Sequence, residues 1–279
     1  MSGFSADWLA LREPYDSKAR NPGVLDAVAR AFRDYPSVTV TDLACGTGST
    51  LRAIRERLPR HQNWRLVDND LGLLGRAAQS AQAAGVGAQG IPTDLAHDLE
   101  AALDGGVDLV TASALLDLVS GAWLDRLAME TAARRIAVYA ALTYDGRIAF
   151  APADPLDADI IAAVNAHQRT DKGFGAALGP DSAQAAIAGF EAVGYEVERG
   201  DADWVFEPQD GVIQAEVLRG WAQAARELGR MSRADIAQWL TRRLALVMAG
   251  RSRIRVGHVD LLARPSGTLT LPESFGAVR

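Results

Sequence analysis

The sequence contains a single cysteine and no long apolar segment, and each absence excludes a class of protein. Cys45 alone cannot form an internal disulfide or a site that needs two thiolates, and no metal site is expected. No run of about 18 apolar residues is present, so no membrane span is expected. Residues 1–15 show neither a basic leader nor a small-residue cleavage site. We therefore expect a protein of the cytoplasm.

A surplus of basic charge is also missing. The 29 Lys and Arg residues are outnumbered by 35 Asp and Glu residues, and the formal net charge is -6. This balance is opposite to that of proteins that bind nucleic acid mainly through its phosphates. A local cluster of arginines comprises Arg242, Arg243, Arg251, Arg253 and Arg255. We expect these side chains to be solvated or paired with acids.

Short apolar runs alternate with segments of helical period along the chain. Strands are predicted at residues 38–43, 64–68, 107–112, 136–142, 148–151, 195–199 and 254–263. Helices are predicted at residues 49–58, 71–84, 122–133, 157–168, 182–193, 212–228 and 233–248. This alternation is typical of a doubly wound α/β fold, in which helices cover both faces of a parallel sheet.

The most informative stretch is a strand that ends in a glycine-rich turn, DLACGTG at residues 42–48, just before a predicted helix. Gly46 and Gly48 lack a Cβ atom, so the backbone can approach a ligand there. The free N–H groups at the start of the helix favour binding as well. Such loops also bind NAD, FAD and ATP, and many are only tight turns.

Two acids follow the loop at the ends of later strands. Asp68, about 20 residues after the loop, can accept hydrogen bonds from both hydroxyls of a ribose, whereas Asp70 fits the start of the next helix. Asp94 ends the strand-like piece 91–95. It can accept a hydrogen bond from an adenine amino group, or it can cap the helix predicted through residues 99–103. A nucleoside site is therefore predicted.

The loop and the two acids, in this order, resemble class I S-adenosylmethionine-dependent methyltransferases over residues 38–150. The resemblance implies a mostly parallel seven-stranded sheet with an antiparallel last strand. It also implies that Asn69 lies against the adenine, that Leu95 offers its backbone to the adenine edge, and that Ser113 approaches the methionine amino group. The cofactor-binding residues expected in this sequence are Arg20, Asp42, Ala44, Gly46, Gly48, Asp68, Asn69, Asp94, Leu95 and Ser113. The family often has glycine where this chain has Ala44. The product is expected to be S-adenosyl-L-homocysteine.

A dinucleotide cofactor fits the loop less well. Its fingerprint requires a third glycine, and the corresponding position is Leu51. Asp42, close to the loop, would oppose a pyrophosphate but is tolerable beside the cationic sulfonium of S-adenosylmethionine.

One methyltransferase domain is expected over residues 1–265, followed by a loosely ordered tail at 266–279. We expect it to contain an N-terminal helical lid (1–35), a Rossmann-like core (36–206), a helical insertion (207–250) and a closing strand (251–265). Pro14 is expected to break the lid helix. Arg12 or Arg20 of the lid could grip the cofactor carboxylate through two hydrogen bonds, although surface arginines are common.

Methyl transfer from a sulfonium is an in-line displacement that depends on alignment and exclusion of water, so a base is not compulsory. If one is used, the candidates are Asp117, His167 and Tyr15. Asp117 follows the fourth strand, where the family places acceptor-facing residues. It could equally be a polar interruption before the next helix. The Asn-Pro-Pro-Tyr type of motif found in enzymes that methylate DNA amino groups is absent there.

Other residues of the second half could contact the acceptor. His167 lies four residues from Asp171, and Arg169 and Lys172 could meet an anionic acceptor, but a helix end with a glycine stop explains the same segment. Trp204 could line an apolar pocket, as could Trp221 and Trp239, although helical spacing favours the core for the last two. Tyr15 could line the same pocket or pack on the sheet. His258 and Cys45 are interpreted as structural.

The leading hypothesis is a methyltransferase that acts on a small molecule, because the acidic charge opposes nucleic acid and the lid and insertion could enclose a small pocket. The alternatives are a protein or RNA methyltransferase with an open cleft, and a catalytically idle scaffold that binds S-adenosylmethionine. The oligomeric state, the acceptor and its methylated atom are left open.

Overall fold

A single mixed sheet runs through the protein. The computed structural model describes residues 4–267, and in these residues the strand order is β3-β2-β1-β4-β5-β8-β6, with β7 paired to β8. The strands are β1 (Val38–Leu43), β2 (Gln62–Asp68), β3 (Gly87–Pro92), β4 (Leu109–Ser113), β5 (Ala137–Ala151), β6 (Tyr195–Asp201), β7 (Trp204–Phe206) and β8 (Arg253–Pro265). Strands β1 to β5 are parallel to one another, and β8 lies antiparallel between β5 and β6. The predicted fold class is confirmed; the short strand β7 adds an eighth strand to the seven expected.

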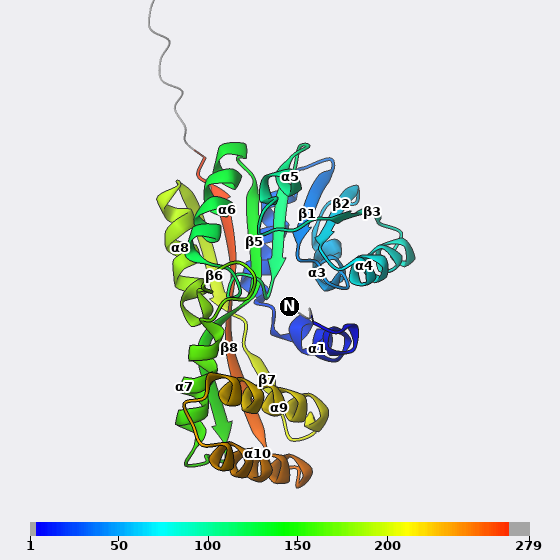
Figure 1. Ribbon diagram of the computed structural model, residues 1–279. Coiled ribbons are helices and arrows are strands. Elements are labelled where there is room, and N and C mark those ends of the chain that lie inside the picture. Colours follow the sequence, from blue (N-terminus) through cyan, green and yellow to red (C-terminus); the bar gives the residue numbers. More distant parts are fainter. Residues whose placement is uncertain (1–3, 268–279) are drawn as a thin grey trace, which may run out of the picture.

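Helices cover both faces of this sheet (Figure 1). They are α1 (Ala6–Ala19), α2 (Pro22–Phe32), α3 (Ser49–Ile54), α4 (Leu71–Ala83), α5 (Leu99–Leu103), α6 (Gly121–Arg134), α7 (Asp157–Gln168), α8 (Ser182–Ala192), α9 (Gly211–Leu228) and α10 (Arg233–Met248). Consecutive residues of a strand face opposite sides, so Val110 of β4 packs with α5, α6 and α8 whereas Leu109 packs with α2, α3 and α4. Two apolar layers therefore enclose the sheet.

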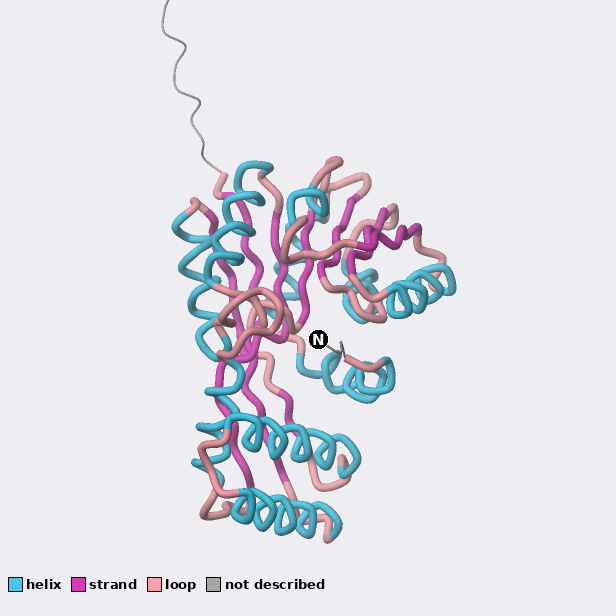
Figure 2. Tube along the Cα trace, in the orientation of Figure 1, coloured by secondary structure: helices cyan, strands magenta, loops and turns pink. Residues whose placement is uncertain are grey.

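A third apolar cluster lies away from these two layers. Strands β5 and β8 continue past the core, and β7, α7, α9 and α10 pack on their far ends around Trp239, Phe206 and Ile213 (Figure 2). We call this part the helical extension. The predicted insertion 207–250 falls within it, together with α7 and the strand ends. The division of residues 1–265 into lid, core, insertion and closing strand stays a prediction.

Strand β5 is one element where two separate strands, 136–142 and 148–151, were predicted. Its pairing with β8 shifts register between Ala140 and Thr143 and again between Tyr144 and Ile148. Leu142 takes a positive φ of 54° at the first shift, and its N–H, displaced from the ladder, donates to Asp260 Oδ1 at 2.8 Å. Two bulges interrupt the alternation of side chains, so the sequence pattern looks like two strands.

Helix α1 is continuous, so the predicted break at Pro14 is wrong. Ser5 caps its start by accepting a hydrogen bond from the Trp8 N–H at 3.1 Å. Pro14 removes the bond that would reach the carbonyl of Ala10, but both residues lie on the exposed face, where water can satisfy that carbonyl. The expectation of a loosely ordered tail concerns mainly residues 268–279, which lie outside the described residues.

The arginine cluster pairs with acids, as expected. Arg243 is fully buried and forms an ion pair with Asp157. The other pairs are Arg242 with Asp154, Arg253 with Glu207 and Arg255 with Asp203. A basic surface for nucleic acid is therefore not formed by these four side chains.

Candidate functional site

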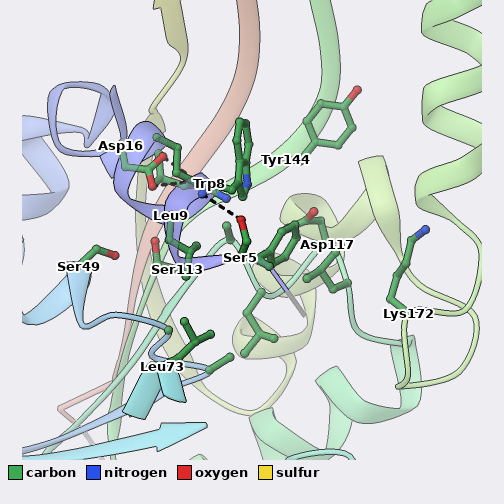
Figure 3. A pocket seen from close by; sticks show the side chains of 18 of the residues that line it. Ser5, Trp8, Leu9, Asp16, Ser49, Leu73, Ser113, Asp117, Tyr144 and Lys172 are labelled. Atoms are coloured by element: carbon green, nitrogen blue, oxygen red, sulfur yellow. Dashed lines mark hydrogen bonds and ion pairs between the residues drawn. The ribbon is translucent and has the colours of Figure 1, made fainter. Parts of the chain in front are cut away.

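A cavity of about 1610 Å³ opens at the carboxyl ends of β1, β2 and β4, between the core and the helical extension. Helix α1 contributes Trp8, Leu9, Arg12 and Asp16 to its lining. Figure 3 shows side chains of α1 beside Ser113 and Tyr144, which come from β4 and β5. Sites for one small ligand measure roughly 300–1,000 Å³, so this cavity has room for two molecules.

The glycine-rich turn forms one wall of the cavity. Its positions Ala44, Gly46 and Gly48 all have positive φ, at 50°, 54° and 83°. A Cβ at Gly46 would come within 3.2 Å of the Leu9 side chain, and one at Gly48 would lie 3.4 Å from Ala77. Glycine at these two positions therefore lets α1 and α4 approach the turn closely.

Ala44 holds a backbone conformation that branched residues rarely adopt. We expect Ala44→Val to lower the free energy of unfolding by about 1–3 kcal/mol and to weaken binding of S-adenosyl-L-homocysteine, because the strain would displace the turn. The matched control is Ala88→Val in β3, where the extended backbone suits valine. Urea unfolding and calorimetry measure the two effects, and an Ala44→Val chain as stable as the control would contradict the expectation.

Asp68 connects the turn to the next strand. Its Oδ2 accepts the Gly46 N–H at 2.9 Å, and its Oδ1 accepts the Asp70 N–H at 3.0 Å. The side chain lines the cavity although the residue is only 9% exposed. Each carboxylate oxygen can accept a further hydrogen bond. Asp68 can therefore order the turn and still bind hydroxyl groups in the cavity.

Asp94 lies on the same side of the cavity, with Asn69 and Leu95. It does not cap the following helix, because Asp98 stands at that N-cap. Its carboxylate instead accepts the Ala96 N–H at 3.0 Å and contacts His97 Nδ1 at 3.1 Å. The bond to His97 holds the pKa of Asp94 below its ordinary value.

Two predicted cofactor residues, Asp42 and Arg20, are buried and are not among the residues that line the cavity. Asp42 Oδ1 accepts a hydrogen bond from the Thr111 hydroxyl at 2.7 Å, and burial raises the pKa of Asp42 to about 7. Arg20 donates to the Tyr139 hydroxyl at 3.1 Å and to Ser113 Oγ at 3.3 Å. Ser113 itself lines the cavity, so Arg20 orients a side chain of the cavity lining. Direct contact of Arg20 with a cofactor stays a prediction.

Asp117 lies across the cavity, in the turn after β4 (Figure 3). The residue is 6% exposed, and its Oδ1 atom is buried with no hydrogen-bond partner among the described residues. Burial raises the pKa of Asp117 to about 6, although Arg12 and Lys172 oppose the shift. A carboxylate of this kind can take a proton near neutral pH.

His167 also lines the cavity, but both ring nitrogens have partners. Nε2 lies 2.9 Å from Glu227 Oε2, and Nδ1 lies 3.3 Å from Lys172 Nζ. The four-residue spacing allowed Asp171 to pair with His167, but the structure shows no such pair. Asp171 Oδ1 instead accepts the N–H groups of Gly173 and Gly175. Arg169 pairs with Asp181. Of the predicted bases in the cavity, Asp117 has the free acceptor atom.

Tyr15 lies outside the cavity lining. Its hydroxyl donates to Asp210 Oδ1 at 3.0 Å, and its ring packs edge-on against Phe206 at 5.2 Å. The helical period turns Tyr15 away from the cavity and toward the extension, so the alternative of packing describes it better than the predicted acceptor contact.

Trp204 does line the cavity, next to a charged pair that was not predicted. Arg12 donates to both carboxylate oxygens of Asp16, at 2.8 and 3.2 Å, and lies over the Trp204 ring at 4.9 Å. The Trp204 Nε1–H donates to Asp16 Oδ1 at 2.9 Å. Arg12 is therefore occupied by Asp16 rather than free for a cofactor carboxylate.

His258 lines the same part of the cavity, contrary to its interpretation as structural alone. Its ring lies 5.0 Å from Trp204 and 6.0 Å from Tyr144. Burial lowers the pKa of His258 to about 3, so the ring is neutral. The sequence analysis also missed two lining residues, Trp8 and Tyr144, and favoured the core for a third, Trp221. Strand alternation or helical period assigns such residues to one face, and only the folded chain shows that this face borders a cavity.

The sheet order, with β8 antiparallel and a glycine-rich turn after β1, defines the fold of class I S-adenosylmethionine-dependent methyltransferases. Residues 40–136 match a family model described as a methyltransferase domain. Together with this fold, the match identifies residues 40–136 as a methyltransferase domain of the class I fold, whose cofactor is S-adenosylmethionine. The matched segment contains Asp68 and Asp94 but not His167, Lys172 or Trp204.

Solved structures share the fold at low sequence identity. The cyclopropane synthase MmaA2 from Mycobacterium tuberculosis is 12% identical, with a TM-score of 0.52 over 94% of this chain and 95% of that one. A methyltransferase from Thiobacillus denitrificans in complex with S-adenosyl-L-homocysteine is 17% identical, with a TM-score of 0.46 over 94% of this chain and 99% of that one. No match is found among curated proteins. No helix within residues 4–267 is long and apolar enough to span a membrane.

Proposed function

We propose that this methyltransferase transfers the methyl group of S-adenosylmethionine to a small molecule. The observation that supports the proposal is the continuation of the cavity beyond the glycine-rich turn, into a space bounded by α1 and the helical extension. We call this space the acceptor compartment; it is lined by Trp8, Asp117, Tyr144, His167, Lys172, Trp204, Trp221 and His258. Its aromatic walls suit an apolar or aromatic body rather than a charged polymer.

The cofactor part of the cavity is proposed to be the side formed by the turn and the strand ends. Asp68 would bind the ribose hydroxyls, Asp94 and the backbone of Leu95 the adenine edge, and Asn69 the adenine face. Ala44, Gly46 and Ser113 would surround the methionine part. Asp42 and Gly48 support this wall without facing the cavity. S-adenosylmethionine then supplies an electrophilic methyl group on its sulfonium.

The contacts of α1 would hold this arrangement closed. Arg52 of α3 donates to Glu13 of α1 at 2.5 and 2.6 Å and to the Thr47 carbonyl of the turn at 2.6 Å. On its other face α1 bonds to the extension through Asp16 and Trp204. Helix α1 therefore bridges the turn and the extension and would exclude water from the methyl group during its transfer.

Asp117 is proposed as the base. Its free Oδ1 would accept the proton of an acceptor hydroxyl or amine while the acceptor atom attacks the methyl carbon and the carbon–sulfur bond breaks. The products are the methylated acceptor, S-adenosyl-L-homocysteine and a protonated Asp117. The proton then passes to water when the cavity opens.

The test uses S-adenosylmethionine labelled in its methyl group. The native chain is incubated with fractionated small-molecule extracts, with total protein and with total RNA, each in a separate reaction. We expect label in the small-molecule fractions alone. Label in protein or RNA would contradict the proposed acceptor class, and cofactor binding without label in any fraction would favour the idle scaffold.

A further inference from the structure

Lys172 reaches the acceptor compartment from a loop with a defined shape (Figure 3). Asp171 Oδ1 accepts the N–H of Gly173 at 2.7 Å and that of Gly175 at 3.0 Å, which closes the loop. The segment that follows this loop is bonded to the turn that carries Asp117, because Gly179 N–H donates to the Asp117 carbonyl at 3.0 Å. Lys172 and Asp117 therefore belong to one connected wall.

The ammonium of Lys172 has two side-chain partners. Nζ donates to Thr170 Oγ1 at 3.0 Å and lies 3.3 Å from His167 Nδ1, whose Nε2 contacts Glu227 at 2.9 Å. Glu227 fixes the ring so that Nδ1 can accept from the ammonium. An ammonium has three donors, so one is left for a ligand.

Lys172 differs in this respect from the other cations that line the cavity. Arg12 is paired with Asp16 at 2.8 Å, and Arg219 with Glu216 at 2.5 Å. Within residues 4–267 no carboxylate lies within 4.0 Å of Lys172 Nζ. The residue is half-buried, and burial lowers the pKa of Lys172. The charges of Glu227 and Asp117 act on Lys172 without a direct ion pair. A half-buried cation with no ion pair is a position where a ligand carboxylate can form a strong, charge-assisted hydrogen bond.

We propose that the methyl acceptor carries a carboxylate that binds Lys172, in addition to the hydroxyl or amino group that faces Asp117. The single remaining N–H donor of Lys172 suits a carboxylate, which carries one negative charge. A phosphate carries more charge and would require further cations beside Lys172. The aromatic side chains Trp8, Tyr144 and Trp204 border the space between these groups and the cofactor. The acceptor class is therefore an aromatic or apolar carboxylic acid with a hydroxyl or amine. This inference rests on the proposed function, since it names the substrate of the same site.

Binding separates this inference from catalysis. The full chain is saturated with S-adenosyl-L-homocysteine, and binding of a panel of aromatic hydroxy- and amino-carboxylic acids is compared with binding of their primary amides by tryptophan fluorescence. We expect at least one acid to bind about tenfold or more tightly than its amide. In Lys172→Gln the ratio should fall to about one, and in Lys172→Arg it should be retained.

The matched control is Arg219→Gln, which removes a cavity cation that already has a partner and should leave the ratio unchanged. No preference for acids across the panel in the native chain, or a preference that survives Lys172→Gln, would overturn the inference. Failure of the proposed function has a different signature. If methyl transfer to small molecules is absent while the acid preference depends on Lys172, the anion site stands and the reaction does not.

Discussion

Replacement of Asp117 by asparagine is expected to lower the rate of methyl transfer by about 10²- to 10⁴-fold, the usual contribution of a general base. Asparagine keeps the shape of the side chain but cannot take the acceptor proton. Binding of S-adenosyl-L-homocysteine should change little, because Asp117 lies on the loop after β4, whereas Asp68 and Asp94 come from the ends of β2 and β3. Single-turnover transfer to the acceptor found in the labelling screen measures the rate, and calorimetry measures cofactor binding.

The control is Asp125→Asn, which makes the same change on the exposed side of α6. Its rate should match that of the native chain. A rate for Asp117→Asn within about tenfold of native would exclude Asp117 as the base and leave alignment as the main source of catalysis.

The pH profile gives an independent measure of the same group. Because burial raises the pKa of Asp117 to about 6, the native rate at saturating cofactor should increase as pH rises from 5 to 7 and then level off. Arg12 and Lys172, the nearby cations, hold this pKa below the value that burial alone would produce. In Asp117→Asn the residual rate should lose this step. An unchanged step in the variant would assign the titration to the acceptor.

The same shift has the opposite consequence for stability. The pKa of Asp117 is raised from 3.8 to about 6, so folding favours its protonated form. The stabilisation from this group is present below pH 3.8 and is lost as pH rises through about 6. At pH 7.5 Asp117→Asn should therefore increase the free energy of unfolding, by up to about 3 kcal/mol, with a smaller gain near pH 4. Urea unfolding at both pH values measures the difference, and a less stable variant at pH 7.5 would contradict it.

Asp68→Ala is expected to weaken binding of S-adenosyl-L-homocysteine about a hundredfold, roughly 2.7 kcal/mol. The change removes the acceptor of the ribose hydroxyls. It also frees the N–H groups of Gly46 and Asp70, which Asp68 holds at 2.9 and 3.0 Å, so the turn loses its anchor. Calorimetry with S-adenosylmethionine and S-adenosyl-L-homocysteine measures the loss.

Two further variants make this result specific. Asp98→Ala removes an exposed acid whose side chain makes no capping bond, so its affinity should equal that of the native chain. Asp68→Asn keeps one oxygen for the turn but has no charge, so its affinity should be intermediate. If Asp68→Ala binds the cofactor within threefold of native, the ribose is bound elsewhere and the proposed cofactor residues are wrong.

Several features of the fold were predictable because they depend on residues close together in the chain. The helix Asp157–Gln168 and the strand Val38–Leu43 have the predicted bounds, since apolar period and local stop signals define both. The turn at Gly46 and Gly48 has the positive φ values that glycine permits. Pro14 was misjudged, because the cost of proline in a helix depends on whether water reaches the carbonyl it leaves unpaired.

The acceptor compartment could be predicted only in part. Asp117 and Lys172 were candidates because they lie in polar segments near strand or helix ends, and both line the cavity. His258 and Tyr144 were not, because each lies on a strand where alternation indicates only that its side chain is inside. Tyr15 was a candidate because it lies in the segment expected to form the lid, and the helical period places it on another face of α1.

The sequence by itself determined the parallel core, the glycine-rich turn, and the acids at the ends of β2 and β3, because apolar period and the conformational freedom of glycine act over a few residues. The tertiary structure alone decided which charges are free. Asp16 lies four residues from Arg12 and pairs with it, and Trp204, 188 residues away, donates a further hydrogen bond to Asp16 Oδ1. Lys172 and Asp117 form no ion pair within 4.0 Å in residues 4–267, although each acts on the other through its charge. Burial and pairing are properties of the assembled fold, so the proton acceptor and the anion site follow from packing.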